Sequence, residues 1–369
     1  MNDLLILQLV TLVFVVSFCL STVIWFTRRF QMPYINGRND LGAVQSSHSV
    51  PTPRLGGMAI VTALSLGSFL IPGDFGAATS MLLLCLAPLF AGGLMDDLGY
   101  GVSPRRRMAL AALSTLLAVA AFGIWIERVG VPGVDWALGL APVGIMFTIF
   151  AVVGVTNAFN LIDGVNGLSI TISLLVATAL GYVAAVHGVP ELAQASALVV
   201  SALGGFLLIN YPFGKVFLGD AGAYSVGFIL ASLAVALMHF APDVSPAAVL
   251  LIFFWPVADT ALAIYRRKVR GRPSDKPDRM HFHQLVMRAL EISLVGRRRR
   301  ALANPLATAF IVPMAASPML AGVLMSDSNA GSFAALFVFA ILFFVAYNLV
   351  IRWARTRPRR PSRSAPARR

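Results

Sequence analysis

Charged residues are scarce in this sequence, and cysteine is almost absent. Only 12% of the 369 residues are Asp, Glu, Lys or Arg, whereas soluble domains carry about a quarter. This shortage excludes an ordinary water-soluble fold. The two cysteines, Cys19 and Cys85, lie inside apolar runs. They therefore indicate small buried side chains and not a disulfide framework or a cysteine-based metal site.

Apolar residues are abundant instead, at 58% of the chain with a mean hydropathy of +0.80. They fall into about eleven runs, each near the roughly 17–25 residues that cross a bilayer as a helix. The sequence therefore predicts an all-α fold, a polytopic transmembrane helix bundle. The eleven predicted spans are 4–26, 55–71, 78–95, 108–124, 137–153, 168–186, 192–209, 221–240, 247–265, 306–325 and 332–351.

Basic residues gather on one side of these predicted spans. Of the 29 Lys and Arg residues, 28 fall there and only Arg128 falls on the other side. By the positive-inside rule the basic side is cytoplasmic, which places the N-terminus outside and the C-terminus inside. The segments that hold the 28 basic residues are 27–54, 96–107, 210–220, 266–305 and 352–369.

The net charge of +13 does not indicate nucleic acid as a partner, because the basic residues adjoin helix ends and form no separate domain. Contact with anionic membrane lipids explains them better. The tail 352–369 holds eight Arg among Pro and Ser, a composition that predicts disorder at the membrane surface. Residues 1–351 are then one transmembrane domain, with 266–305 as its largest cytoplasmic loop.

Carboxylates also stand at helix ends on the basic side. Asp96 and Asp97 lie in MDDLGYG, Asp163 lies in NAFNLIDGVNGL, and Asp220 lies in FLGDAG. Three loops thus supply acids at one membrane depth, and such oxygen ligands suit Mg²⁺. Plain turns are the competing interpretation for single loops, because Asp-Gly and Asn-Gly pairs favour turns.

Arginines accompany the acids. Arg105 and Arg107 closely follow the Asp96–Asp97 pair, where they would offset its repulsion or bind phosphate. Arg54 ends the segment HSVPTPR before two glycines. It either frames a phosphate or is only a positive-inside charge.

Three further residues are candidates for function. His281 and His283, in DRMHFHQL, either contact a phosphate or are simply solvated. Asp259 lies inside the ninth predicted span. An acid there is either functional or hydrogen-bonded to a neighbouring helix.

Taken in order, these segments resemble the polyprenyl-phosphate N-acetylhexosamine-1-phosphate transferases. The resemblance is carried by HSVPTPRLGG, DDLGYGVSPRRR, NAFNLIDGVNGL, NYPFGKVFLGDAG and HFHQ, which span residues 48–284. It implies an enzyme of a bacterial inner (cytoplasmic) membrane that transfers an N-acetylhexosamine 1-phosphate from a UDP-sugar to undecaprenyl phosphate and releases UMP. Mg²⁺ is the implied cofactor, with Mn²⁺ as the alternative.

The resemblance also implies roles for individual residues. Asp220 resembles the metal ligand, and Asp96 and Asp97 resemble an acid pair for the lipid phosphate or the metal. His281 and His283 match a histidine motif at the sugar and pyrophosphate end, and both count as catalytic candidates with the acid pair. The implied substrate-binding residues are Arg54, Arg105, Arg107, Asn157, Asn160, Asp163, Asn166, Asn210 and Phe217, the last of which would pack on uracil.

Two departures from the family pattern concern the nucleotide and the sugar. The family commonly has Asp where this chain has Asn166, and a third histidine where it has Gln284. They argue most strongly against the peptidoglycan translocase, a distant member of the family. The sugar stays open, and a homodimer is compatible with the sequence. The rival function is a transporter or flippase of lipid-linked or nucleotide sugars, which would place polar residues throughout the spans.

Overall fold

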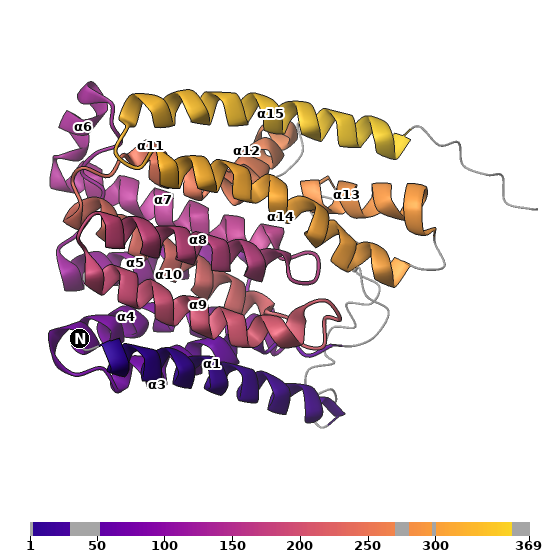
Figure 1. Ribbon diagram of the computed structural model, residues 1–369, viewed down its shortest axis with the longest axis horizontal. Coiled ribbons are helices and arrows are strands. Elements are labelled where there is room, and N and C mark those ends of the chain that lie inside the picture. Colours follow the sequence, from indigo (N-terminus) through magenta and orange to yellow (C-terminus); the bar gives the residue numbers. More distant parts are fainter. Residues whose placement is uncertain (1–2, 30–51, 270–279, 297–299, 356–369) are drawn as a thin grey trace, which may run out of the picture.

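The computed structural model describes residues 3–29, 52–269, 280–296 and 300–355. Every regular element in this part of the chain is a helix, and most of the helices run lengthwise in one elongated bundle (Figure 1). The long helices are α1 (Asp3–Phe26), α4 (Gly73–Asp97), α5 (Pro104–Phe122), α7 (Ala141–Ile162), α8 (Leu168–Val186), α9 (Pro190–Asn210), α10 (Gly219–Phe240), α14 (Arg300–Leu324) and α15 (Asn329–Arg355). The shorter ones are α3 (Gly56–Phe69), α6 (Pro132–Leu138), α11 (Pro246–Ile252), α12 (Phe254–Val269), α13 (Phe282–Leu290) and the π-helical turn η2 (Glu291–Val295).

The all-α prediction is confirmed for the described residues, and eight of their helices are long and apolar enough to cross a membrane. A helix accompanies each of the eleven predicted spans, but three of these helices fall outside the eight. α3 has only 14 residues, and α5 opens with three arginines that shorten its apolar part. The third case is the predicted span 247–265, which is broken.

That ninth predicted span divides into α11 and α12, which meet at Phe253 with a bend of 82°. Pro256 lies in the first turn of α12, where its missing N–H is tolerated and its fixed φ favours a new helix. If the bent pair counts as one span, the described residues hold nine. The bend points α12 away from the direction of α11 and brings Asp259 close to α13.

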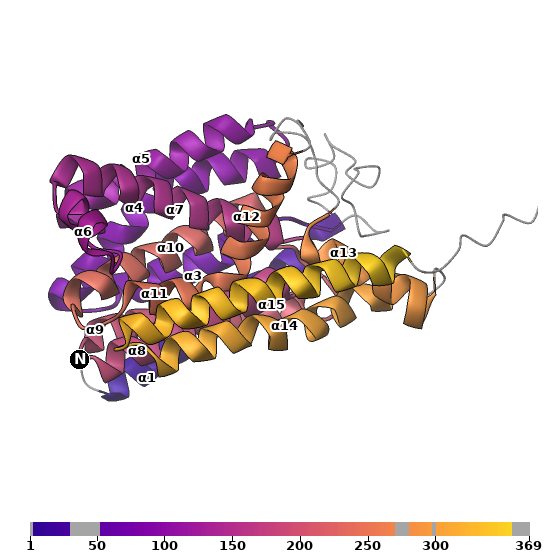
Figure 2. The same cartoon turned by 90° about the horizontal axis from the view of Figure 1, so that it is seen from above.

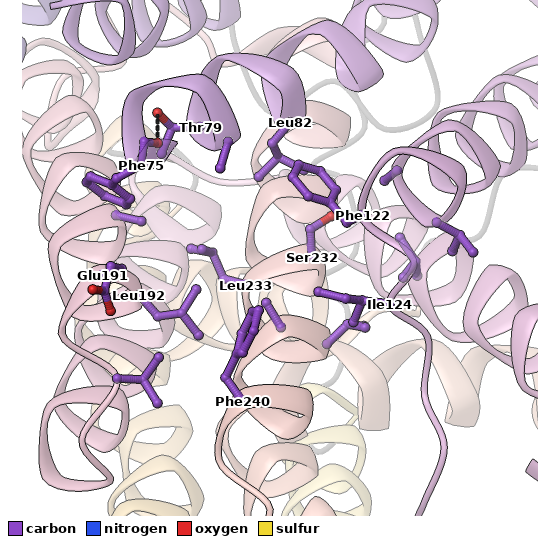
Figure 3. Close-up of a pocket in the computed structure, with 18 of the residues that line it drawn as sticks. Phe75, Thr79, Leu82, Phe122, Ile124, Glu191, Leu192, Ser232, Leu233 and Phe240 are labelled. Carbon is purple, nitrogen blue, oxygen red and sulfur yellow. Dashed lines mark hydrogen bonds between the residues drawn. The ribbon is translucent and has the colours of Figure 1, made fainter. Parts of the chain in front are cut away.

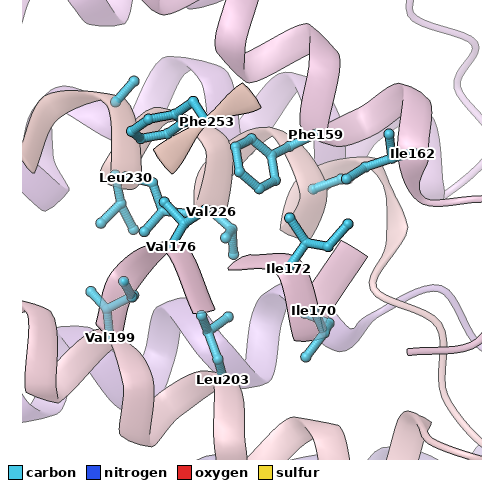
Figure 4. Packing of buried hydrophobic residues seen from close by; sticks show 14 of the residues in the cluster. Phe159, Ile162, Ile170, Ile172, Val176, Val199, Leu203, Val226, Leu230 and Phe253 are labelled. Carbon is cyan, nitrogen blue, oxygen red and sulfur yellow. The ribbon is translucent and has the colours of Figure 1, made fainter. Parts of the chain in front are cut away.

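The centre of the bundle is α10, which is buried along most of its length. It packs against α3, α4, α7 and α8, and Figure 2 shows it between α4 and α5 on one side and α14 and α15 on the other. Around it Phe159 meets Phe253 edge to face at 6.2 Å, within the apolar cluster of Figure 4. A Cβ on Gly57 would meet the backbone of Gly222, so small residues let α3 approach α10 closely.

The first residue of α1 and the last of α15 lie at opposite ends of the bundle (Figure 1). An odd number of crossings requires this arrangement. The helix α15 continues to Arg355, so the first four residues of the predicted tail 352–369 are helical, and residues 356–369 lie outside the described part of the chain. The predicted loop 266–305 contains α13 and η2, and α14 begins six residues before the predicted span 306–325.

Candidate active site

Five helix ends meet at one end of the bundle. The last residues of α4 and α7 lie there with the first residues of α3, α5 and α10, because the helices alternate in direction. Their polar side chains contact one another across gaps of up to 166 residues in sequence. The prediction that acids from separate loops gather at one depth is thus met by Asp96, Asp97 and Asp220.

Asp97 lies at the end of α4 and caps the N-terminus of α10. Its carboxylate oxygens accept hydrogen bonds from the backbone amides of Asp220 at 2.9 Å and Ala221 at 2.8 Å. An anion is favourable there because the first amides of a helix lack partners and carry partial positive charge. Gly219, with φ +75°, allows this approach, since a Cβ would overlap the Asp97 carboxylate and the Arg54 carbonyl.

Arg54 reaches both buried acids from the segment before α3. Its Nε lies 3.6 Å from Asp97 Oδ1, and its Nη2 donates to Asp220 Oδ1 at 3.3 Å. Backbone hydrogen bonds fix this segment: Phe217 N donates to Pro53 O at 2.8 Å, and Gly56 N donates to Phe217 O at 2.9 Å. The PTPRLGG stretch is therefore paired with the chain just before α10, which positions Arg54 beside Asp220.

Arg107, in the first turn of α5, contacts Asp96 and, together with Arg54, Asp220. Its Nη1 donates to Asp96 Oδ2 at 3.1 Å and also contacts Asp220 Oδ2. The guanidinium lies 5.6 Å from the centre of the Tyr224 ring, a cation–π contact that holds it in place. Asp96 Oδ1 accepts from Val102 N at 2.7 Å, so the loop between α4 and α5 closes on this acid.

The end of α7 adds an amide and a fourth carboxyl. Asn160 Nδ2 donates to Asp220 Oδ1 at 3.2 Å. Asp163 follows one turn later, where burial raises the pKa of its carboxyl to about 7; Arg54 lowers the pKa in opposition, and Asp97 adds to the rise. At neutral pH the protonated and ionised forms of this carboxyl are therefore both populated, unlike those of an ordinary aspartate.

Asn166 and Asn210 tie two loops of the site together. Gly167 N donates to Asn210 Oδ1 at 2.7 Å, and Asn166 Nδ2 donates to Pro212 O at 3.0 Å. Asn166 N donates in turn to Asn304 Oδ1, at 2.7 Å, on α14. Both asparagines are buried, and their contacts hold the loop at 163–167; their role in nucleotide binding stays a prediction.

Sequence reasoning missed Asn304 and Thr308. Thr308 Oγ1 donates to Asn166 O at 2.6 Å, and both α14 side chains are buried. Their signal was a pair of polar residues four apart near the start of an otherwise apolar span, a spacing that places them on one helix face.

The histidines form a second polar group beside the 163–167 loop. His281 Nδ1 lies 2.8 Å from Asp259 Oδ2, and the rings of His281 and His283 stack at 5.8 Å. The His283 ring lies against Gly164, where an added Cβ would overlap it. Burial lowers the pKa of His283 to about 4, so its ring is neutral at pH 7. Both histidines are buried, which contradicts the interpretation that they are simply solvated.

Three remaining candidates have weaker structural support. Phe217 is half-buried, with its backbone paired to the segment before α3. Asn157 is half-buried and Arg105 is exposed. The side chains of Asn157 and Arg105 have no hydrogen bond or ion pair within the described residues. Substrate binding by all three candidates therefore stays a prediction.

The donor chemistry of the site fits a hard divalent cation. Among the described residues no three acidic, histidine or cysteine side chains are grouped closely enough to enclose a metal ion by themselves. In the part of the chain that the structure describes, Asp96, Asp97 and Asp220 nevertheless form ion pairs with two arginines, Arg54 and Arg107. This surplus of negative charge on oxygen atoms, with phosphate and water completing the shell, is what Mg²⁺ uses in proteins.

A cavity of about 510 Å³ lies at the opposite end of the bundle (Figure 3). It lies between the first turns of α4 and α9 and the last turns of α5 and α10, and its lining is almost entirely apolar, with Phe122, Leu233 and Phe240 among its residues. None of the acids and arginines described above lines it. It is therefore separate from the candidate active site.

The features so far define a polytopic helical membrane protein with a carboxylate and arginine site at one end. The chain belongs to glycosyl transferase family 4, whose family model matches residues 79–238. This confirms the resemblance stated above. The match contains Asp96, Asp97, Asp163 and Asp220, whereas the histidines lie beyond it.

Three curated relatives carry related names. The undecaprenyl-phosphate alpha-N-acetylglucosaminyl 1-phosphate transferase of Yersinia pestis is 30% identical over 247 residues, which is 66% of this chain and 67% of that protein. The protein of the same name from Salmonella typhi is 27% identical over 343 residues, 90% of this chain and 88% of its own. A probable undecaprenyl-phosphate N-acetylglucosaminyl 1-phosphate transferase of Bacillus subtilis is 26% identical over 254 residues, 68% and 70% of the two chains.

Proposed function

We propose that this protein transfers an N-acetylhexosamine 1-phosphate from a UDP-sugar to undecaprenyl phosphate, the first step of a lipid-linked envelope glycan. A phosphate oxygen of the lipid attacks the phosphorus that carries the sugar. The bond between this phosphorus and the oxygen bridging to the uridine-bearing phosphate breaks, and UMP leaves. The observation that carries the proposal is the meeting of Asp96, Asp97 and Asp220 with Arg54 and Arg107 at one end of the bundle.

The chemistry explains why such a site holds both charges. Two phosphates repel each other, so a catalyst must position them and offset their charge. Arg54 and Arg107 supply guanidinium groups with donors suited to phosphate oxygens. The acids hold these arginines in place, and Asp96 or Asp97 would accept a proton from the lipid phosphate.

The same carboxylates are the proposed ligands of the cofactor. Asp220 and Asp97 would hold Mg²⁺, or Mn²⁺ in its place, and Asn160 would support Asp220. When bound, the ion neutralises charge on the pyrophosphate of the donor. The residues themselves orient Asp220, because Asp97 fixes the first turn of α10.

The membrane location follows from the lipid substrate, which never leaves the bilayer. We assign the site end of the bundle to the cytoplasmic face of a bacterial inner membrane, since 28 of the 29 basic residues belong to the segments that the sequence predicts on that side. Anionic lipids would contact the same face. The outer end then carries the apolar cavity of Figure 3.

The test is a defined assay with purified protein, undecaprenyl phosphate, Mg²⁺ and a panel of UDP-N-acetylhexosamines. UDP-GlcNAc is the first donor to try, because the names of the relatives describe them as N-acetylglucosaminyl 1-phosphate transferases. The wild-type protein should release UMP and form a lipid-linked sugar. Asp220→Asn should remove at least about 99% of this activity, while Asp74→Asn, an exposed acid at the other end, should not.

The two rival outcomes are distinct. A folded preparation that releases no UMP from any UDP-amino sugar contradicts the proposal. Transport of a lipid-linked or nucleotide sugar across vesicles without UMP formation supports the transporter instead. Full activity of Asp220→Asn leaves the reaction standing but refutes the metal assignment.

A further inference from the structure

Asp259 is a buried acid that the proposed chemistry has not yet used. It lies on α12, just after the bend at Phe253, with only 2% of its surface exposed. Burying a carboxylate among apolar side chains is costly unless hydrogen bonds satisfy it. Both oxygens are satisfied here: Oδ1 accepts from Phe282 N at 3.0 Å, and Oδ2 accepts from His281 Nδ1 at 2.8 Å.

This arrangement fixes the tautomer of His281. An ionised carboxylate can only accept hydrogen bonds, so the proton must lie on Nδ1. The lone pair of the neutral imidazole is then on Nε2, and the ring plane is set by the Nδ1–Asp259 bond. The same logic orients histidines in catalytic sites where a carboxylate holds one ring nitrogen and the other does the chemistry.

His281 in turn supports the contact between α13 and the active-site loop. Its ring stacks on His283 at 5.8 Å with an angle of 16°. His283 lies against Gly164, next to Asp163. The side chain of His283 is buried, and its Nε2 has no hydrogen-bond partner within the described residues.

The bond from Phe282 N to Asp259 is not the only contact that anchors α13. Phe282 packs against Trp255 at 4.9 Å and against Phe343 at 5.5 Å between ring centres. Tyr347 OH donates to Met280 O at 3.0 Å, immediately before the helix. Since these contacts hold the segment, the distinct contribution of Asp259 is the orientation of His281.

We propose that Asp259 is a positioning residue for the transfer reaction, which holds His281 in its Nδ1–H tautomer and aligns the His281–His283 stack against the 163–167 loop. The inference rests on the proposed function. In it the Nε2 atom of His281 serves the phosphate and sugar end of the substrate, while His283 packs the stack against Gly164. Asp259 itself contacts no substrate.

The central experiment compares Asp259→Asn with wild type in the UMP-release assay. Asn accepts from Phe282 N with its oxygen and then presents an NH₂ group to His281, which moves the ring proton to Nε2. We expect kcat to fall about 10- to 100-fold while KM for the UDP-sugar changes less than about threefold. Thr260→Val is the matched control, because Thr260 is a buried neighbour whose Oγ1 has no partner in the described residues; its kcat should stay within about twofold of wild type.

A double mutant shows whether Asp259 acts through His281. In the His281→Gln background, Asp259→Asn should lower kcat by less than about twofold further, because residues that act as a unit are not additive. If the two effects multiply, or if Asp259→Asn leaves kcat unchanged, the inference is wrong. If Asp259→Asn fails to fold, Asp259→Glu tests the inference instead. Because this variant retains a carboxylate, its kcat must exceed that of His281→Gln, and a kcat no higher than that of His281→Gln would contradict the inference. A wild-type protein without activity would refute the proposed function instead.

Discussion

The carboxylate of Asp97 is hydrogen-bonded to the backbone amide of Asp220, at 2.9 Å, and not to its side chain. The two acids therefore have different tasks in the folded protein. Asp97 holds the first turn of α10, and that turn directs the Asp220 side chain toward Arg54, Arg107 and Asn160. A change at Asp97 should thus alter the site even where Asp220 is intact.

Asp97→Asn should weaken both stability and activity. An amide offers one acceptor oxygen where the carboxylate offers two, and it loses the charge that the helix N-terminus favours. Hydrogen bonds to a charged group are worth about 1.5–3 kcal/mol. We expect a lower thermal unfolding temperature in detergent and at least about a tenfold loss of UMP release. Asp74→Asn is the control, and equal unfolding temperatures for both variants would contradict the capping role.

Arg107→Lys should cost activity although the positive charge is retained. The guanidinium spans Asp96 and Asp220 and lies over Tyr224, and a single ammonium cannot reproduce this geometry. We expect UMP release to fall about tenfold or more. The exposed Arg106→Lys is the control and should leave the rate within about twofold. Full activity of Arg107→Lys would show that only the positive charge matters at this position, and similar losses in both variants would contradict a specific role for the Arg107 contacts.

The sequence predicted the helical class and the meeting of three acids at one end of the bundle, for a physical reason. Apolar run length determines whether a segment can cross a bilayer, and motifs at helix ends on one side must lie at one depth. Asp96, Asp97 and Asp220 meet as this argument expected.

The broken span and the loop contacts were not predictable in the same way. A hydropathy window counts apolar residues and does not detect the bend at Phe253, although Pro256 after a large aromatic residue was a local signal. The bond from Asn166 N to Asn304 joins residues 138 apart in sequence. Such a contact depends on how α8 and α14 pack, which composition does not encode.

Gly219→Ala should destabilise the protein more than Gly188→Ala does. Both glycines have a positive φ, +75° and +74°, so both variants carry the same backbone strain of roughly 1–2 kcal/mol. Only at Gly219 would the new Cβ overlap Asp97 and the Arg54 carbonyl, whereas nothing lies within 4 Å at Gly188. Thermal unfolding measures the difference, and UMP release should fall in Gly219→Ala alone. Equal unfolding temperatures would mean that the site tolerates the added carbon.

Arg128→Gln should lower stability without changing the chemistry. Its Nη2 donates to the carbonyls of Met238, Ala241 and Val244, the last at 2.8 Å, and so satisfies the far end of α10. Losing these charged hydrogen bonds should cost about 1–3 kcal/mol. The kcat for UMP release at 25 °C should stay within about twofold of wild type. A large fall in kcat in a folded sample would show that the outer end of α10 influences the site.

Asp163 makes the stability of the protein depend on pH in a direction opposite to that of an ordinary aspartate. In the unfolded chain its pKa is near 3.9, whereas burial raises the pKa to about 7 in the fold. Between these values the folded state binds the proton and the unfolded state does not, so this contribution is full below about pH 4 and is lost as pH rises through 7. The contribution is at most roughly 4 kcal/mol, since one pKa unit is about 1.4 kcal/mol.

Asp163→Asn removes this titration and isolates it from the other acids. The difference in unfolding temperature, variant minus wild type, should become more positive from pH 5 to pH 8, because the wild type must bury a charge at the higher pH. His283 contributes with the opposite sign, since its pKa of about 4 means that acid favours the unfolded state. The unfolding temperature of His283→Gln, relative to that of wild type, should therefore rise as pH falls from 7 to 5. If both differences were independent of pH, the pKa shifts of Asp163 and His283 would be wrong in direction or absent.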